Sequence, residues 1–307
     1  MSLKKLKYLQ EVPMRKAVEF LIIDPQNDFC NPKGALFVTG ADKDSERLAE
    51  CVRRLSDQIN DIHVTLDSHH LVDIAHPIFW INDKGEHPAP FTLISKKDVM
   101  DGKWYPKNPA WSKRALDYVT SLEVNKRYIL CIWPPHCLIG SWGHNVVDPV
   151  YKAITEWEQK FNLVDYVTKG SNLFTEHYSA VQADVPDAKD PGTSLNIQLI
   201  KILQDAPLIA LSGEALSHCV ANTVRDIANN FGEENIKKMV LLIDTTSSVP
   251  GFEQMGEDFL KEMTRRGMQI CKSIDFNPWE KYGSSYKISM YWMRTCILWI
   301  WIQIIWK

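Results

Sequence analysis

The feature of this sequence that most constrains its fold is a set of short apolar runs, rich in β-branched residues, that alternate with helical patterns. Most of these runs are typical of buried strands, and they occupy residues 18–23, 62–66, 163–167, 208–211, 240–243 and 268–271. Helical spacings lie between several of them, as at Leu48, Val52 and Leu55. The alternation predicts an α/β fold with a doubly wound, mostly parallel sheet and helices on both faces.

Residues 77–128 differ from the rest of the chain. They are rich in Pro, Lys, Trp and Asp, with turn signals at 83–85 and 106–109. We interpret them as an insertion over the sheet edge. Because neither an internal repeat nor a low-complexity linker divides the sequence, we predict a single domain over residues 1–287 with a long inserted loop at about 77–128.

Residues 288–307 form an apolar, tryptophan-rich tail of unknown role. A membrane-spanning helix needs ~20 apolar residues, and Arg294 interrupts the run well before that length is reached. We therefore do not expect membrane attachment. A docked amphipathic segment and a stretch foreign to the ancestral domain remain open alternatives.

Composition narrows the class of partner. The 307 residues carry a net charge of −3, so no basic face for nucleic acid is indicated and a small molecule is the expected partner. The seven cysteines are odd in number, widely spaced and free of C-x-x-C pairs, which is typical of thiols in a reducing compartment. Residues 1–16 lack the apolar run of a signal peptide, so we predict a cytoplasmic protein. The sequence leaves a homo-oligomer open.

A candidate metal site follows the second apolar run. Asp67 and His69 are two residues apart, so in an extended segment they point to the same side and can share one ion. An exposed polar loop is the alternative. His136 follows two prolines that stiffen the backbone presenting its ring, which suits a third ligand. One Asp with two His suits zinc, iron and manganese alike.

Two further polar residues end strands of the predicted sheet. Asp24 directly follows the first run, and Lys169 closes the third. In a doubly wound sheet the active groups gather at the carboxyl ends of the strands, so both side chains can face one crevice. The alternatives are a turn-forming Asp and an ordinary surface Lys.

Cys219 is the candidate nucleophile. It lies between an apolar strand and a helical pattern, where a helix N-terminus lowers the pKa of a thiol and stabilises the thiolate. A small core residue is the alternative. Cys137 is a rival nucleophile that we rank second, because it opens no clear helix.

These motifs occur in the order found in a known family. The strings at 24–30, 67–69, 133–137, 169–170 and 217–220 resemble those of the nicotinamidase branch of the isochorismatase-like cysteine hydrolases. The resemblance extends over residues 18–272. It implies the isochorismatase-like hydrolase fold, a catalytic set of Asp24, Lys169 and Cys219, and a divalent metal, usually zinc, held by Asp67, His69 and His136.

The resemblance also implies the surroundings of the reaction. It places an oxyanion hole at the backbone amides of Ala215 and Cys219 and a cis peptide at Glu214–Ala215. Aromatic walls sandwich a pyridine ring whose nitrogen faces the metal, and the matching residues are Phe29, Trp133 and Tyr178. His76 is an open candidate for an additional ligand, because its spacing differs by one residue from the family pattern.

The expected activity is hydrolysis of nicotinamide to nicotinate and ammonia through a thioester on Cys219. Relatives that act on isochorismate lack the cysteine, and amidases for carbamoyl compounds typically lack the D-x-H site. Two departures leave the substrate open: the loop between Asp67 and Trp133 is long, and Ser217 stands where an acidic residue often precedes His-Cys. The alternatives are the same chemistry on another small amide, or a non-catalytic binding or membrane-associated relative.

Overall fold

The computed structural model describes residues 17–125 and 128–278, and its centre is a six-stranded sheet in the order β10-β9-β8-β1-β2-β7. Every pair of neighbouring strands in it is parallel. The strands are β1 (Val18–Ile23), β2 (Ile59–Asp67), β7 (Asp165–Lys169), β8 (Ile209–Gly213), β9 (Met239–Leu242) and β10 (Gln269–Cys271). Each predicted apolar run therefore contributes one strand.

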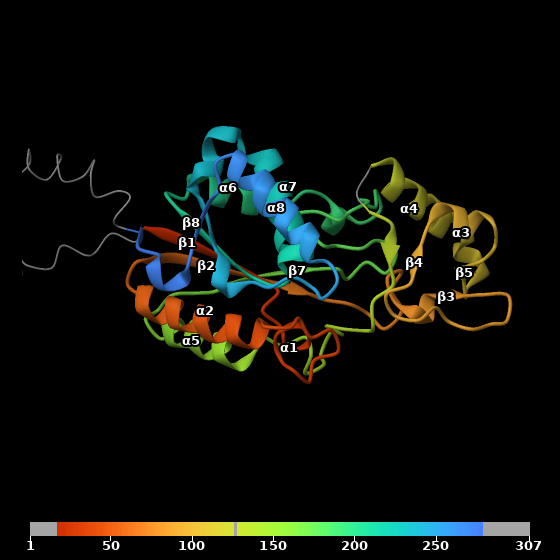
Figure 1. Ribbon diagram of the computed structural model, residues 1–307, viewed down its shortest axis with the longest axis horizontal. Coiled ribbons are helices and arrows are strands. Elements are labelled where there is room, and N and C mark those ends of the chain that lie inside the picture. The colour runs from red at the N-terminus through yellow and green to blue at the C-terminus, as the bar shows by residue number, and fades with distance from the viewer. Residues whose placement is uncertain (1–16, 126–127, 279–307) are drawn as a thin grey trace, which may run out of the picture.

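Helices cover both faces of this sheet, as Figure 1 shows. One face carries α2 (Ala41–Leu55) and α5 (Asp148–Glu158), and the other carries α6 (Ile197–Asp205), α7 (Ala221–Phe231) and α8 (Glu253–Arg265). Leu48, Val52 and Leu55 of α2 are buried, as their spacing predicts. The prediction of a doubly wound α/β fold is confirmed.

The strand order places the functional crevice. From β1 the chain adds β2 and β7 on one side and then β8, β9 and β10 on the other. Ligands of open α/β sheets bind outside the carboxyl ends of the strands where the order reverses, which here is between β1 and β8. All six residues of β1 are buried, as expected for the central strand of a sheet covered on both faces.

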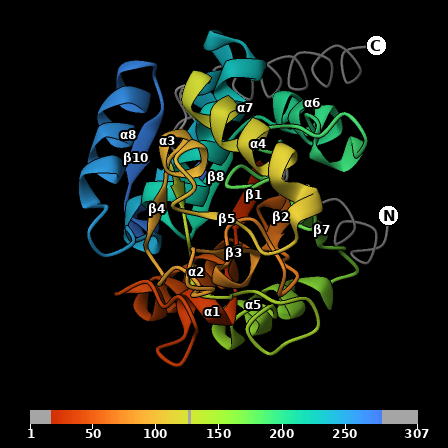
Figure 2. The same cartoon turned by 90° about the vertical axis from the view of Figure 1, so that its right-hand side faces the viewer.

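The predicted insertion has secondary structure of its own. It forms one small antiparallel sheet of β3 with β5, contributes β4 to a second with β6, which follows directly after it, and contains two α-helices. These elements lie beyond the carboxyl ends of the central strands in Figure 1 and in front of them in Figure 2. Their bounds are β3 (Trp80–Ile81), β4 (Leu93–Ile94), α3 (Lys96–Met100), β5 (Tyr105–Pro106), α4 (Ser112–Val124) and β6 (Leu130–Cys131).

Short helical turns complete the fold. One of them, the π-helical turn η5, precedes α7 and carries the predicted nucleophile. The short elements are α1 (Asn27–Cys30), η2 (Pro77–Phe79), η3 (Pro109–Trp111), η4 (Pro191–Thr193), η5 (Leu216–Val220), η6 (Glu233–Lys238), η7 (Ile243–Thr245) and η8 (Ser273–Asp275).

The apolar tail at 288–307 and the residues before Ala17 lie outside the described part of the chain. In the part that is described, none of the helices combines the length and apolar character needed to cross a bilayer.

A buried histidine lies between two carboxylates in the sheet, away from the carboxyl ends. His63 of β2 has Nδ1 2.8 Å from Oδ2 of the half-exposed Asp165 and Nε2 3.6 Å from Oε2 of the buried Glu19. Burial on its own would lower the pKa of His63, but the contacts with Glu19 and Asp165 outweigh it, so the pKa is raised. The imidazolium therefore stabilises the folded state.

These contacts predict a pH-dependent stability difference for His63→Gln. A group whose pKa is raised on folding contributes stability fully below its unfolded value, about 6.5, and loses it as pH rises through the folded value. We expect the variant to be less stable than the wild type by about 1–3 kcal/mol at pH 5.5, the range for hydrogen bonds between charged groups. The difference should shrink at pH 9. Urea unfolding measures it, and a difference independent of pH would contradict the charged pairing.

Candidate active site

The three predicted catalytic residues meet at the carboxyl ends of the central strands. Asp24 directly follows β1, Lys169 is the last residue of β7, and Cys219 lies in η5 after β8. Lys169 Nζ is 3.0 Å from Asp24 Oδ2 and 3.7 Å from Cys219 Sγ. All three side chains are buried, so the alternative of a surface lysine is wrong. Asp24 does lie in a turn, in which its carbonyl oxygen accepts the Gln26 N–H at 2.7 Å, but its side chain is bonded to Thr65.

Lys169 also contacts the candidate metal site. Its Nζ lies 3.0 Å from Asp67 Oδ1 and donates to the carbonyl of His177 at 2.8 Å. Burial on its own would lower the pKa of Lys169, but the negative charges of Asp24 and Asp67 outweigh it and raise the pKa well above its ordinary value. The ammonium thus stays charged and joins the two clusters.

Asp24 is held by a residue that sequence reasoning missed. Thr65 of β2 donates its hydroxyl to Asp24 Oδ1 at 2.5 Å, and the same hydroxyl oxygen accepts the Asp24 N–H at 3.0 Å. Burial raises the pKa of Asp24, Lys169 opposes this, and the charge of Asp67 raises the pKa further, with a net upward shift. A carboxylate with a raised pKa is a stronger base than an exposed one.

The pKa of Cys219 differs from the sequence prediction. Burial raises it well above its ordinary value, Lys169 opposes this, and Asp24 and Asp67 raise it further. Burial among carboxylates therefore opposes the resting thiolate that the helix N-terminus is expected to favour. The thiol proton needs an acceptor, and the carboxylate of Asp24 is the neighbouring candidate, because Lys169 Nζ contacts both Asp24 Oδ2 and Cys219 Sγ.

The three predicted metal ligands also come together. Candidate ligand atoms of Asp67, His69 and His136 all lie within 4.8 Å of one another, and the residues are buried. His69 Nε2 is 3.0 Å and His136 Nε2 3.3 Å from Asp67 Oδ2.

The hydrogen bonds of the two imidazoles suit a metal. His69 Nδ1 lies 3.1 Å from Asp73 Oδ2, and His136 Nδ1 lies 2.9 Å from the carbonyl oxygen of Pro134. Both partners are acceptors, so in a metal-bound form with neutral rings the proton of each would lie on Nδ1 and the Nε2 lone pair would be free for the ion. This is the orientation that outer hydrogen bonds impose on metal-binding histidines, and the donor set fits a divalent cation.

His76 lies beside this cluster. Its ring centroid is 5.1 Å from that of His69 and 5.5 Å from that of His136. Nδ1 lies 3.2 Å from the carbonyl of Leu71, whereas Nε2 is buried and has no hydrogen-bond partner within the described ranges. Burial lowers the pKa of His76 to about 4, so the ring is neutral. Its free lone pair suits an additional ligand, although that role stays a proposal.

Two residues of the 24–30 string hold the metal-site backbone. Gln26 Oε1 accepts the Asp67 N–H at 2.7 Å, while its Nε2 donates to the Asp67 carbonyl at 2.7 Å. Asp28 Oδ2 accepts the Cys137 N–H at 2.7 Å, next to His136. Sequence reasoning quoted both residues within the string but assigned them no role.

The predicted aromatic walls lie on two sides of the site. Trp133 Nε1 donates to the Tyr178 hydroxyl at 2.8 Å, so these two rings form one rigid unit. Phe29 lies against the metal cluster, with its ring centroid 5.3 Å from that of His136. All three aromatic side chains are buried.

The predicted oxyanion-hole segment has the expected backbone. The Glu214–Ala215 peptide is cis, and the Ala215 N–H donates to no backbone carbonyl within residues 17–125 and 128–278. Gly213, at φ 110°, cannot be replaced without a shift, because a Cβ there would lie 1.9 Å from the Ile23 carbonyl oxygen. This close approach brings the turn carrying Cys219 against the end of β1.

A buried carboxyl that the sequence did not single out adjoins the site. Glu176 follows β7, and its Oε1 accepts the His177 N–H at 3.1 Å. Burial raises its pKa to about 8, while the nearby His69 opposes the shift. Its position in an irregular loop left no periodic signal in the sequence.

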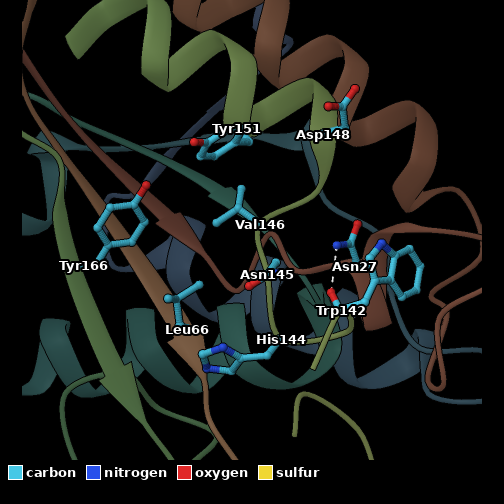
Figure 3. Close-up of a pocket in the computed structure, with 9 residues that line it drawn as sticks. All are labelled: Asn27, Leu66, Trp142, His144, Asn145, Val146, Asp148, Tyr151 and Tyr166. Carbon is cyan, nitrogen blue, oxygen red and sulfur yellow. Dashed lines mark hydrogen bonds between the residues drawn. The ribbon is translucent and has the colours of Figure 1, made fainter. Parts of the chain in front are cut away.

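A separate groove of about 600 Å³ lies between α5 and the strands β2 and β7 at one edge of the sheet. Figure 3 shows Tyr151 and Tyr166 at the upper left of the lining, Asn27 and Trp142 at its right and His144 below. No predicted catalytic or metal residue lines the groove. His144 connects it to the metal-site strand through a 2.8 Å contact between Nε2 and the Ser68 hydroxyl.

Comparison with known proteins agrees with this geometry. No protein-family model matches the chain. It is 27% identical to the nicotinamidase of Saccharomyces cerevisiae over 222 residues, which are 72% of this chain and 84% of that protein.

Solved structures show the same fold at low sequence identity. Yeast nicotinamidase superposes with a TM-score of 0.57 at 20% identity, covering 82% of this chain and 98% of that one. A nicotinamidase/pyrazinamidase of Acinetobacter baumanii gives 0.57 at 18%, covering 85% and 98%. The pyrazinamidase of Pyrococcus horikoshii, solved in complex with zinc, gives 0.50 at 19%, covering 83% and 98%.

The chain thus has the fold of the isochorismatase-like hydrolases. Its similarity to nicotinamidases in sequence and in fold confirms the resemblance inferred from its motifs.

The metal cluster predicts a loss of bound metal in Asp67→Ala. This change removes the carboxylate that both Nε2 atoms face, so we expect the purified variant to hold less than a tenth of the divalent metal of the wild type. Elemental analysis by plasma mass spectrometry measures the content. His70→Ala is the matched control, because His70 is exposed and adjoins His69. Equal metal content in Asp67→Ala and the wild type would rule this site out.

Proposed function

We propose that the protein hydrolyses nicotinamide to nicotinate and ammonia through a thioester on Cys219. The observation that carries the proposal is the position of Lys169 Nζ, which lies within 3.0 Å of both Asp24 and Asp67 and 3.7 Å from the Cys219 sulfur. One ammonium thereby connects a base, a nucleophile and a metal-ligand carboxylate.

The first half of the reaction uses these groups in order. Asp24 takes the thiol proton, and the Cys219 sulfur attacks the amide carbon while the adjacent ammonium of Lys169 stabilises the negative charge. The backbone N–H groups of Ala215 and Cys219 would donate to the tetrahedral oxyanion. Asp24 then returns its proton to the leaving nitrogen, ammonia departs and the thioester remains.

The second half reverses these roles. Asp24 takes a proton from water, whose oxygen attacks the thioester carbon. The carbon–sulfur bond breaks, the proton returns to the sulfur of Cys219, and the carboxylic acid product leaves. Burial of the site excludes other water from the thioester.

A divalent cation fits Asp67, His69 and His136, with zinc the first choice and iron or manganese the alternatives. When bound, it would supply a positive charge that orients a ring nitrogen of the substrate. Phe29, Trp133 and Tyr178 would hold the ring between apolar surfaces. The cytoplasmic location stays a prediction that the described residues do not test.

A second candidate substrate class is another small amide. The inserted segment borders the aromatic walls: the ring of Phe91 is 5.7 Å from Trp133, and the ring of Tyr128 is 4.6 Å from Tyr178. An insertion in this position can select for substituents on the ring. The non-catalytic alternative would require biological output to survive Cys219→Ser.

Ammonia release tests the proposal and identifies the nucleophile. We expect the purified, metal-loaded protein to release ammonia from nicotinamide, and Cys219→Ala to lose at least about 10³-fold of the turnover, as is typical when a nucleophile is removed. Cys137→Ala is the matched control, since Cys137 is the buried rival thiol and should not be needed.

The possible outcomes separate the candidates. Turnover of other amides alone would keep the mechanism and discard nicotinamide as the substrate. Turnover that survives in Cys219→Ala but not in Cys137→Ala would overturn the assignment of the nucleophile.

A further inference from the structure

Ser217 and His218 form a buried polar pair directly before the nucleophile. Ser217 is 0% and His218 6% exposed, and both lie in the π-helical turn that carries Cys219. Ser217 stands where relatives often have an acidic residue. A serine hydroxyl can donate a hydrogen bond, whereas a carboxylate can only accept one.

The position of the hydroxyl proton follows from the contacts of Ser217. Its oxygen accepts the Val249 N–H at 3.0 Å and lies 2.8 Å from His218 Nδ1. The hydroxyl also carries one proton, and a buried donor left without an acceptor costs about 1–3 kcal/mol. Among the described contacts of this hydroxyl, His218 Nδ1 is the acceptor available. The proton is therefore donated to Nδ1, and the imidazole proton lies on Nε2.

The surroundings keep the His218 ring neutral. Its centroid lies 5.2 Å from that of Trp133, 5.3 Å from that of Tyr178 and 4.9 Å from that of Phe252, with the rings nearly perpendicular. Burial in this aromatic cage lowers the pKa of His218 to about 4. At neutral pH the ring is an uncharged imidazole with one donor and one acceptor.

The remaining donor is available to a ligand. Within the described parts of the chain, His218 Nε2 has no hydrogen-bond partner, and unlike His177 Nε2 it is not sealed from solvent. Trp133 and Tyr178, which border the ring, are two of the three residues assigned to the substrate walls. The donor therefore lies beside two of the proposed substrate walls and on the same turn as Cys219. In the proposed function, these walls and Cys219 bound the substrate chamber.

We propose that the Ser217 hydroxyl fixes His218 as the Nε2–H tautomer, which gives the substrate chamber a neutral hydrogen-bond donor. The donor selects ring amides that carry an acceptor atom, such as an aromatic nitrogen, over isosteres with a C–H at that place. The selectivity rests on the proposed amidase function, whereas the tautomer does not.

The same argument predicts what an acidic residue at position 217 does. A carboxylate only accepts hydrogen bonds, so it requires a proton on Nδ1 and turns Nε2 into an acceptor. One side chain outside the chamber thus decides whether the chamber offers a donor or an acceptor. Residue 217 acts as a positioning residue through His218.

Nitrogen-15 NMR of histidine-labelled, metal-loaded protein tests the tautomer at pH 7. Long-range proton–nitrogen correlations distinguish a protonated ring nitrogen from an unprotonated one, and loss of a signal in His218→Phe assigns the residue. We expect His218 with a proton on Nε2 and an unprotonated, hydrogen-bonded Nδ1. A proton on Nδ1, or on both nitrogens, in the wild-type protein would by itself overturn the proposal.

Variants of Ser217 test the cause. Ser217→Thr retains the hydroxyl and should keep the Nε2–H pattern, whereas Ser217→Ala should shift the Nδ1 resonance because the donated hydrogen bond is lost. Ser217→Asp should move the proton to Nδ1. An unchanged Nδ1 resonance in Ser217→Ala would show that the hydroxyl does not set the tautomer.

Ligand binding tests the donor. Calorimetry in the Cys219→Ala background, where turnover is blocked, compares two matched pairs: nicotinamide with benzamide, and pyrazinamide with nicotinamide. We expect that adding His218→Phe reduces the preference for the acceptor-bearing partner about five- to tenfold in at least one pair, the worth of one hydrogen bond.

The outcomes separate this inference from the proposed function. Equal preferences with and without His218→Phe would mean that the Nε2–H group points at a neighbouring aromatic ring and not at the ligand. The selectivity claim would then be wrong. If no ring amide binds, the proposed function and the selectivity claim fail together, while the NMR result still decides the tautomer.

Discussion

The ammonium of Lys169 is the charge on which the rest of the site depends. It lies 3.0 Å from both Asp24 and Asp67, two buried carboxylates that would otherwise repel each other. Removing one partner of a buried ion pair typically costs about 3–5 kcal/mol, so none of these three charges is stable in this position alone. The catalytic and metal clusters therefore form one electrostatic unit, in which the neutral thiol of Cys219 is the group that can change its charge.

The sheet explains how this unit is assembled. Asp24, Asp67 and Lys169 each stand at the carboxyl end of a parallel strand, and adjacent strands in the order β1, β2, β7 bring them side by side. Gly213 allows the turn after β8 to approach the end of β1, which brings Cys219 to the same place. The fold thus supplies the short distances, and burial raises the pKa values of both Asp24 and Cys219.

The sequence predicted most of this arrangement because strand ends carry a signal: an apolar run followed by a polar residue. Asp24, Asp67 and Lys169 were identified in this way. Groups held by tertiary contacts carried no such signal. Thr65 is one of several polar residues within its strand, and Glu176 lies in an irregular loop. The raised pKa of Cys219 results from burial and from the charges of Asp24 and Asp67, which are distant from it in the sequence. The small sheets of the insertion were missed because two-residue strands are too short to show a period.

The most direct test of the account is intact-mass spectrometry of the metal-loaded enzyme, acid-quenched during turnover of nicotinamide. A thioester mechanism predicts a transient species heavier by one nicotinoyl group in place of the thiol hydrogen, with peptide mapping locating it on Cys219. An acyl group on Cys137, or steady turnover during which Cys219 is never acylated, would contradict the mechanism.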